Sequence, residues 1–437
     1  MKPTVDEAAI GELLAEFGIP SAAIGILHDG EITEVAVGVK NVRTGEPATT
    51  DTIYQCGSMT KTWTAYVFLQ LVAEGRVGLD EPVRTYLPGF RVADPFVTAH
   101  VTPRHLLNHT SGIEEDYGDP GEGDDIYERM VAGIADAPQV SPLGGPHGYS
   151  AALGYAILAR IMEVLDGKPW DAIMADRLFR PLGLTSTSSR PTQVDPARAA
   201  TGHIGSIESP VPYLPRAYGP GGTVSSTVRE VLTMASALPI GSEMTGSRVP
   251  VPDPYLFGPE WALGLIVCDW HGRTVFASDG STIGQNARLR ILPDAGLTVA
   301  LLTNGGPREG FYKRVLNEIL GAGTVPELPA PARGLTLDPA RYVGVYGRPG
   351  AAFEVTAEGG RLRLTETIDP MHARFTGKPE RVTYDLQPVS ETHFLMPSND
   401  PLEDTRTLAL FDFTDGRARY LHTNCRLHPR LEKSVLG

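Results

Sequence analysis

The sequence predicts an α+β fold: an antiparallel sheet flanked by helices, with an all-helical part, followed by a small all-β domain. Strand-like runs occur near the N-terminus and return between residues 261 and 302, whereas the stretch between them has mostly helical periodicity. A proline-rich segment then precedes a series of short strands. The chain has 437 residues, more than the roughly 250–300 at which a single core stops growing, so we expect two domains.

The sheet begins after an amphipathic N-terminal helix. Residues 22–27 and 31–37 are apolar runs joined through Asp29-Gly30, and an Asp-Gly pair is a strong signal for a hairpin turn. Later strands of the same sheet are expected, from their apolar runs and turn signals, over residues 261–269, 274–277, 286–291 and 297–302.

The helical part contains one strongly apolar segment. Most positions from 59 to 72 are apolar, which predicts a helix that is buried on most sides. Further helices, separated by Gly and Pro, are predicted over residues 155–165, 170–178 and 223–237.

A linker is predicted over residues 325–334, which contain three prolines. The first domain then covers residues 1–324 and the second covers residues 335–437. The second has short alternating strands with glycine-rich turns between them, which predicts a small barrel or half-barrel. Its clearest strands are expected over residues 353–356, 361–365, 382–386, 407–413 and 417–422.

Composition excludes several classes of partner. The net charge is −14 and no run of Lys or Arg forms a basic stripe, so nucleic acid is not an expected partner. No stretch approaches the roughly 18 apolar residues of a membrane span, so no membrane partner is expected either. The N-terminus lacks the apolar core of a secretory signal, which predicts a cytoplasmic protein.

The cysteines and short motifs indicate neither a metal nor a cofactor. Cys56, Cys268 and Cys425 are scattered without metal-ligand spacing, so we expect no zinc site and no disulfide framework. The sequence contains no G-x-S-x-G elbow, no H-E-x-x-H pair, no phosphate-binding glycine loop and no dinucleotide fingerprint.

Ser58-Met59-Thr60-Lys61 is the motif that points to chemistry. Three residues of spacing on a helix place the Ser58 hydroxyl and the Lys61 amine on one face. A serine needs an adjacent base to act as a nucleophile, and a lysine serves when burial lowers its pKa. The helix start also offers free backbone N–H groups to an oxyanion. The alternative interpretation is that Ser58 only caps the helix and Lys61 is a solvated charge.

Six segments share an order and spacing with one known superfamily: residues 54–61 (YQCGSMTK), 75–83, 102–113, 180–184, 219–227 and 279–285. Together they resemble the serine β-lactamase and penicillin-binding-protein superfamily, in its class C-like branch of esterases and D-peptidases. The resemblance runs through most of residues 5–310. It implies a β-lactamase/transpeptidase-like first domain and an acyl-enzyme on Ser58.

The second motif of this family is Tyr-x-Asn on a loop facing the serine, and residues 148–151 (GYSA) occupy the corresponding stretch. The resemblance implies that Tyr149 relays protons between nucleophile, lysine and leaving group. Ala151 replaces the asparagine, so the amide that orients a substrate carbonyl is missing. Because the spacing to the next helix is one residue longer than usual, Ser150 is the alternative occupant, although a phenol suits the relay better.

The third motif, normally Lys or His followed by x-Gly, is here Ser278-Asp279-Gly280. Gly280 still lets a strand approach the substrate closely, and the backbone N–H of Ser281 is the expected second oxyanion donor, since that role needs no particular side chain. Loss of the cation should weaken binding of a substrate carboxylate. Penicillin hydrolysis is therefore not the expected physiological activity.

Two histidines and one arginine complete the candidates. The resemblance implies a structural role for His109, in an Asn-His-Thr-Ser-Gly turn, while His147 is a weaker candidate for a base. Through residues 342–346 (YVGVY) and its rhythm of short strands, the second domain resembles the lipocalin-like domain of some D-aminopeptidases and of penicillin-binding-protein-type thioesterases that cyclise nonribosomal peptides. Within it, Arg426 either binds a substrate carboxylate through its guanidinium or lies on a solvated barrel rim.

The sequence thus predicts a serine acyl-transfer enzyme whose substrate is a small peptide, a peptidyl thioester or an ester, with or without a carrier protein. The acyl group is expected to pass to water or to an amine, and release or cyclisation of a nonribosomal peptide is one form of this reaction. A simple carboxylesterase or a D-aminopeptidase is the alternative within the family. The alternative from another class is an inactive binding protein on the same scaffold, suggested by the two altered motifs.

Overall fold

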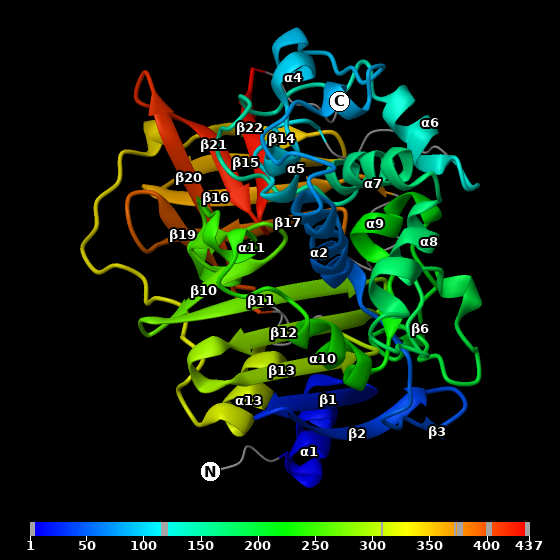
Figure 1. Cartoon of the computed structure of the whole chain (residues 1–437). Helices are drawn as coiled ribbons and strands as arrows, with labels where there is room; N and C mark the ends of the chain where they lie inside the picture. The colour runs from blue at the N-terminus through cyan, green and yellow to red at the C-terminus, as the bar shows by residue number, and fades with distance from the viewer. Residues whose placement is uncertain are drawn as a thin grey trace.

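The computed structural model describes residues 5–114, 121–306, 309–370, 373, 379–398 and 404–432. It is a mixed α/β structure with a β-lactamase-like first domain and a C-terminal barrel, as expected. Figure 1 shows the barrel strands, in orange and red, beside the helical part and above the large sheet.

The large sheet contains nine strands, and every neighbouring pair is antiparallel. Strands from the start of the chain lie beside strands formed more than 250 residues later, because β1 pairs with β13 from Ala22↔Thr303 to His28↔Leu297. Along the sheet the strands follow the order β3 (Glu46–Pro47), β2 (Glu31–Asn41), β1 (Ser21–His28), β13 (Leu297–Thr303), β12 (Gln285–Leu292), β11 (Arg273–Thr282), β10 (Ile266–Trp270), β9 (Glu260–Trp261) and β8 (Val249–Pro250).

Helices cover both faces of this sheet. On one face α1 (Glu7–Phe17) and α13 (Glu309–Leu320) bury their apolar residues against β1, β12 and β13 in one core cluster. On the other face α10 (Val228–Ser236) packs closely enough on β1 that a methyl group on Gly25 would lie 2.7 Å from Leu232. The same face joins the sheet to the helical part through a second, larger core.

The predicted buried helix over residues 59–72 is α2 (Thr60–Ala73), preceded by a 3₁₀ turn (Gly57–Met59). Two short pairs of strands accompany the helical part, β4 (Tyr54–Gln55) with β7 (Ser225–Ser226) and β5 (His203–Ile204) with β6 (Ile207–Glu208). The other helices of the first domain are α3 (Val83–Tyr86), α4 (Pro95–His100), α5 (Pro103–Leu107), α6 (Ile126–Gly133), α7 (Leu153–Asp166), α8 (Trp170–Met174), α9 (Gly219–Gly222), α11 (Glu243–Gly246) and α12 (Pro254–Phe257).

Four predicted elements differ from the structure. The strand expected over 274–277 is longer, since β11 covers Arg273–Thr282. The helix expected over 223–237 begins only at Val228, because the Thr227 side chain caps it by accepting from the Glu230 N–H. The strand expected over 261–269 is divided into β9 and β10, since the chain turns between them with Gly264 at φ +82°. The helix expected over 170–178 is α8 followed by a π-helical turn (Ala175–Phe179).

The C-terminal domain is a nearly closed, nine-stranded antiparallel barrel. Its two edge strands, β17 and β18, are separated by Leu386 alone, so the chain itself joins the two ends of the sheet. Buried apolar side chains fill it, among them Tyr346, Leu364 and Phe394. The strands are β14 (Gly344–Arg348), β15 (Ala351–Glu358), β16 (Arg361–Ile368), β17 (Arg381–Asp385), β18 (Gln387–Pro388), β19 (His393–Met396), β20 (Arg406–Thr414), β21 (Arg417–Thr423) and β22 (Arg426–Leu431).

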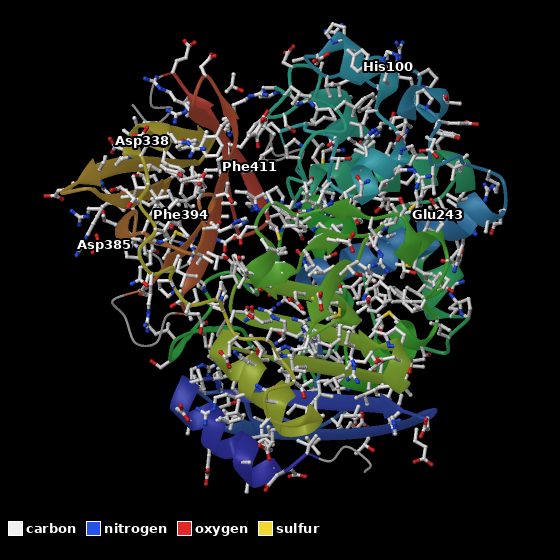
Figure 2. All side chains as sticks on the ribbon, turned by 90° about the vertical axis from the view of Figure 1, so that its left-hand side faces the viewer. His100, Glu243, Asp338, Asp385, Phe394 and Phe411 are labelled. Carbon is white, nitrogen blue, oxygen red and sulfur yellow. The ribbon has the colours of Figure 1, made fainter. Side chains whose placement is uncertain are left out.

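The barrel is bound to the first domain by polar contacts. The Asp404 carboxylate accepts from the N–H groups of Glu309 and Gly310 at the start of α13, at 2.6 and 3.0 Å. Thr407 on β20 donates to the Asp253 carboxylate at 2.7 Å. Burial raises the pKa of Asp253 to about 6. In Figure 2 the barrel, with Phe394 and Phe411 labelled, lies beside the helical part that carries His100 and Glu243.

The segment that connects the two domains has no helix or strand from residue 321 to residue 338, a range that the structure describes in full. The proline-rich residues predicted as a linker fall within it, and the domain boundaries placed around them remain predictions. In the described parts of the chain, no helix combines the length and the apolar character needed to cross a membrane.

Candidate active site

Ser58 lies in the 3₁₀ turn that leads into α2, and Lys61 lies in the first turn of that helix. The Lys61 ammonium Nζ is 3.4 Å from the Ser58 Oγ, so the pair predicted from the sequence is brought together. Lys61 is buried, whereas Ser58 is half-buried and accessible. Hydrogen bonds of this kind often tighten when substrate binds, so a separation of 3.4 Å is compatible with proton transfer.

Two backbone carbonyls also accept from Lys61, and the sequence did not reveal either of them. Nζ donates to the Ala151 carbonyl at 2.7 Å and to the Gly221 carbonyl at 2.8 Å. In the neutral form of Lys61 these two carbonyls can accept both amine protons, which leaves the Nζ lone pair for the proton of the Ser58 hydroxyl. In the sequence, the close contact at Gly221 is indicated by the glycine-rich stretch around it. Glycine is needed there because an added methyl group would lie 2.6 Å from the Ala151 carbonyl oxygen.

The strand β11 passes close to the serine turn because two glycines allow it. A methyl group on Gly280 would lie 1.9 Å from the Cys56 carbonyl oxygen, and one on Gly57 would lie 2.5 Å from the Ser281 backbone nitrogen. Gly57 also has φ +54°, which favours glycine. The Ser281 N–H therefore lies against the turn that carries Ser58, where an oxyanion donor is expected.

One edge of β11 is open beside this turn. Strand β10 pairs only as far as Ala277, whereas β12 continues along β11 to Thr282. In the described part of the chain, residues 278–282 therefore pair on one side only. Such an edge can bind an extended peptide by main-chain hydrogen bonds.

The side chains of the third motif point away from this edge. Ser278 is buried, and its hydroxyl lies 2.6 Å from that of Thr62 on α2. Thr62 gives its single proton to the Gly264 carbonyl at 2.8 Å, so Ser278 is the donor in this pair. Ser278 was predicted among the substrate-binding residues, and in this conformation its hydroxyl is held within the protein.

Asp279 faces the opposite side of the sheet. Its carboxylate binds the guanidinium group of Arg290 and lies 3.6 Å from the Nε of Arg288. Arg288 in turn binds Glu309 at the start of α13. This buried ion-pair network holds the middle of the motif to the far face of the sheet.

Tyr149 and Ser150, the two alternatives for the second motif, have different surroundings. The Lys61 Nζ lies 4.8 Å from the centre of the Tyr149 ring, so this phenol borders the lysine. Ser150 is buried and its hydroxyl accepts from the Gly154 N–H at 3.0 Å, in the first turn of α7. Of the two side chains, Tyr149 is therefore the one that the geometry favours for the proton relay.

His109 and His147 form a buried aromatic cluster with Trp261 behind Tyr149. His147 lies 4.9 Å from Trp261 and 5.9 Å from His422 of the barrel, measured between ring centres. Burial, with a smaller contribution from His422, holds the pKa of His147 well below its ordinary value. His147 is thus enclosed with other rings, in an environment typical of a packed neutral histidine.

Arg426 is the first residue of β22 and comes from the barrel. Its guanidinium carbon lies 6.0 Å from the centre of the Tyr149 ring, and the backbone carbonyl of the preceding Cys425 accepts from the Tyr149 N–H at 2.8 Å. Of the two interpretations of Arg426, the structure therefore favours a place beside the candidate site over a distant rim.

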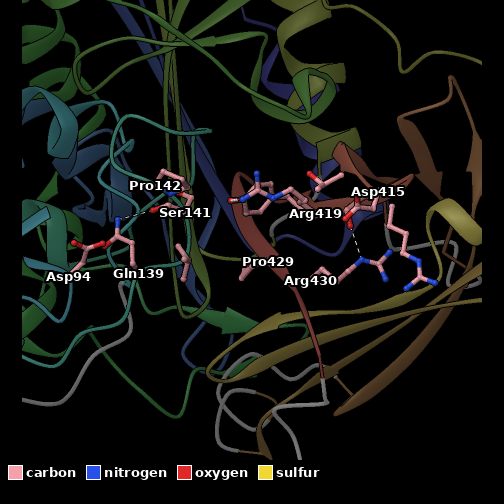
Figure 3. A pocket seen from close by; sticks show the side chains of 13 residues that line it. Asp94, Gln139, Ser141, Pro142, Asp415, Arg419, Pro429 and Arg430 are labelled. Atoms are coloured by element: carbon pink, nitrogen blue, oxygen red, sulfur yellow. Dashed lines mark hydrogen bonds between the residues drawn. The ribbon is translucent and has the colours of Figure 1, made fainter. Parts of the chain in front are cut away.

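A separate cavity lies between the first domain and the outside of the barrel. It has a volume of about 940 Å³. Figure 3 shows Asp94, Gln139, Ser141 and Pro142 on one wall and Asp415, Arg419, Pro429 and Arg430 on the other. None of the predicted catalytic residues lines it.

Comparisons with known proteins agree with this architecture. The family model described as Beta-lactamase matches residues 7–322. Penicillin-binding protein 4 of Amycolatopsis lactamdurans is 39% identical over 367 residues, which cover 78% of this chain and 96% of that protein. Esterase EstB of Burkholderia gladioli is 30% identical over 200 residues, covering 41% of this chain and 49% of that esterase.

A solved structure extends the similarity into the barrel. The crystal structure of SurE matches with a TM-score of 0.75 and 27% identity, and the match covers 97% of this chain and 99% of that one. A second structure of SurE, with D-Leu, matches with the same TM-score. Because nearly the whole chain is covered, the similarity includes the C-terminal barrel.

Proposed function

This chain belongs to the beta-lactamase family and is an enzyme of the serine hydrolase type, and from that premise we propose that it transfers acyl groups through an ester on Ser58. One observation carries the proposal. The Ser58 hydroxyl, the Lys61 amine and the Ser281 N–H meet beside the open edge of β11. A nucleophile, a base and an oxyanion donor around one substrate edge are the parts that acyl transfer needs.

In the proposed acylation, neutral Lys61 removes the Ser58 hydroxyl proton as Oγ bonds to the substrate carbonyl carbon. The carbonyl oxygen becomes an oxyanion, which the backbone N–H groups of Ser58 and Ser281 stabilise. Collapse of this intermediate breaks the bond to the leaving group, which takes a proton relayed from Lys61 through Tyr149. Water or an amine then attacks the ester by the reverse sequence and frees Ser58.

The proposed substrate is a small peptide activated at its C-terminus, as a thioester or an ester. Similarity to SurE over almost the entire chain supports a peptide whose acyl residue has the D configuration, since SurE has been crystallised with D-Leu. An extended peptide would pair with the free edge of β11 at residues 278–282. A carrier protein that holds the thioester is compatible with this substrate and is part of the proposal.

Arg426 supplies the only side-chain cation proposed for substrate recognition. The third motif offers Ser278 where the family has Lys or His, and that hydroxyl is bonded to Thr62. A guanidinium group from the barrel replaces the missing charge and binds a carboxylate of the substrate. Peptidyl thioesters with a side-chain carboxylate should therefore depend on Arg426 more than neutral esters do.

Hydrolysis of simple esters is the second candidate function. Similarity to esterase EstB favours it, although that match covers less than half of either chain. An esterase needs the same Ser58 and Lys61 but no recognition of peptide configuration. The two candidates therefore differ in substrate preference rather than in the first chemical step.

The test is intact-mass spectrometry after exposure to a fluorophosphonate, to p-nitrophenyl esters and to short peptidyl thioesters ending in D-Leu or L-Leu. We expect an adduct on the wild type, loss of that adduct in Ser58→Ala, and faster acylation by the D-Leu thioester. In Arg426→Gln, peptidyl thioesters that carry a side-chain carboxylate should acylate more slowly while neutral esters are unaffected. Fastest acylation by simple esters favours the esterase, and the absence of any adduct points instead to a binding protein.

A further inference from the structure

The loop that carries Tyr149 is held through three successive backbone N–H groups. Gly148 donates to the His109 carbonyl at 2.9 Å, Tyr149 donates to the Cys425 carbonyl at 2.8 Å, and Ser150 donates to the His109 Nδ1 at 3.0 Å. Two residues, one from each domain, thus accept all three. The orientation of the Tyr149 side chain depends on this backbone path.

His109 is placed by an uncommon backbone conformation. It follows α5 and has φ +59°, a left-handed conformation that costs free energy in a residue other than glycine. This conformation directs the carbonyl to Gly148 and the buried imidazole under Tyr149, with the two ring centres 4.7 Å apart. Backbone strain of this kind persists where the surrounding structure requires it.

Because a backbone N–H can only donate, Nδ1 of His109 must carry the lone pair and Nε2 the proton. The neutral imidazole is therefore the form that holds Ser150. Burial is the main cause that holds the pKa of His109 well below its ordinary value, and the neighbouring His147, Lys61 and Arg426 act in the same direction. The hydrogen bond to Ser150 thus persists at neutral pH.

Cys425 comes from the turn between β21 and β22. The two central residues, Asn424 and Cys425, have φ +49° and +61°, which are the signs of a type I′ turn. Such turns prefer Asn-Gly, yet the second position here is cysteine. Its buried side chain packs in one cluster with Trp261, Ile266 and Ala277, at the end of β10 beside the open edge of β11.

We propose that His109 and Cys425 together form a clamp that positions Tyr149 beside Lys61, so that the barrel completes the proton relay of the first domain. Both are positioning residues, since they act through Tyr149. The inference rests on the proposed role of Tyr149 in catalysis. It assigns to His109 a part in the reaction rather than in folding alone, and to the barrel a part in assembling the site.

The first test compares His109→Leu with His109→Asn. Asparagine tolerates the left-handed conformation and offers an amide oxygen near the position of Nδ1, whereas leucine offers no acceptor. We expect His109→Leu to lower kcat on the order of a hundredfold, as a small displacement of a catalytic group does, and His109→Asn to recover most of it. The pH–rate profile should shift in the leucine variant and return to that of the wild type in the asparagine variant.

The second test treats the barrel side with Cys425→Gly and Cys425→Val. Glycine keeps the turn and its carbonyl, whereas a β-branched residue does not adopt φ +61° without strain. We expect Cys425→Val to lower kcat by a larger factor than it changes KM. We expect Cys425→Gly to keep most of the wild-type rate, although it loses the packing of the thiol. Thermal unfolding midpoints of all variants separate a loss of stability from a loss of positioning. If His109→Leu does not fold, the two Cys425 variants still test the clamp.

Tyr149→Phe separates failure of this inference from failure of the proposed function. If Tyr149→Phe leaves kcat unchanged, the relay role of Tyr149 is wrong. If it lowers kcat while folded His109→Leu and Cys425→Val retain wild-type rates and pH profiles, Tyr149 is catalytic and the clamp is wrong. An equal loss of kcat in Cys425→Gly and Cys425→Val, or in His109→Asn and His109→Leu, would also contradict the clamp. The acceptor that the glycine or asparagine variant retains would then have no effect on the rate.

Discussion

At the scale of single residues, the surroundings of Lys61 depend on the backbone as well as on side chains. Two of its acceptors are the carbonyls of Ala151 and Gly221. A carbonyl is present at every residue, so its position depends on the path of the chain and not on which side chain the sequence specifies. The replacement of asparagine by Ala151 therefore leaves Lys61 held, although it removes an amide from the substrate side.

A single added methyl group should separate β11 from the serine turn. Gly280→Ala puts a Cβ 1.9 Å from the Cys56 carbonyl oxygen, a clash that should displace the Ser281 N–H. Loss of one oxyanion donor costs about 10²–10³ in kcat, and we expect a fall of that order in the acylation of any ester that the wild type accepts. Stopped-flow or steady-state rates measure it.

Gly89→Ala is the matched control, because Gly89 is exposed and no atom would lie within 4 Å of its added methyl. It should react at the wild-type rate. A Gly280→Ala variant that folds and equals this control would rule out the oxyanion role of Ser281.

At the scale of elements, predictions were good where apolar periodicity extends over many residues. The buried helix around residues 60–73 and the strands β12 and β13 lie where the pattern indicated, whereas β11 extends beyond the expected 274–277 to Thr282. The pattern was less informative over 223–237 and 261–269. In the first range a Thr227 cap delays the helix, and in the second a turn at Gly264 interrupts the strand. The cap and the turn each involve one or two residues. These are too few to change the apolar periodicity of a segment of about ten residues.

The start of α13 is stabilised by a residue from the other domain. The Asp404 carboxylate accepts from two N–H groups of the first turn, as an N-cap side chain does. Asp404→Ala should lower the free energy of unfolding by about 1 kcal/mol, the usual cost of losing such a cap. Denaturant titration measures this difference.

Asp136→Ala serves as the comparison, since Asp136 is exposed and is not bonded to the start of a helix. It should leave the unfolding midpoint unchanged. If Asp404→Ala is as stable as Asp136→Ala, the contact does not contribute to the docking of the barrel.

At the scale of the whole molecule, a buried histidine from each domain lies at the contact between barrel and first domain. His147 of the first domain faces His422 of the barrel, and burial lowers the pKa of His422 to about 3. His428, also on the barrel, has its pKa held well below the ordinary value by burial. All three are therefore neutral in the folded protein at neutral pH.

Stability should fall as the pH is lowered from about 6.5 toward 5. The unfolded chain binds protons at the ordinary histidine pKa of about 6.5, whereas folded His422 binds one only near pH 3. Between these values the unfolded state holds more protons, and each such histidine costs up to about 1.4 kcal/mol per pH unit. Asp253 acts in the opposite direction between about pH 4 and 6, because its pKa is raised, but it is a single group.

Calorimetry or denaturant titration between pH 5 and 7 measures this dependence. His147→Leu removes one buried titrating group and should flatten the slope, while exposed His100→Leu should not. A wild-type slope in His147→Leu would show that the buried imidazole does not control acid stability.

The sequence by itself determined the fold class and the Ser58–Lys61 pair, which depend on periodicity, on turn signals and on a spacing of three residues along one helix, all of which are local. The family was identified from the resemblance of six sequence segments to a known superfamily. Only the tertiary structure decided which of Tyr149 and Ser150 borders the lysine, that two carbonyls hold Lys61, and that Arg426 and Cys425 of the barrel reach the site. Every residue carries a backbone carbonyl, so the sequence does not indicate which carbonyls bind Lys61. The contacts of Tyr149 with Cys425 and Arg426 depend on how the two domains pack.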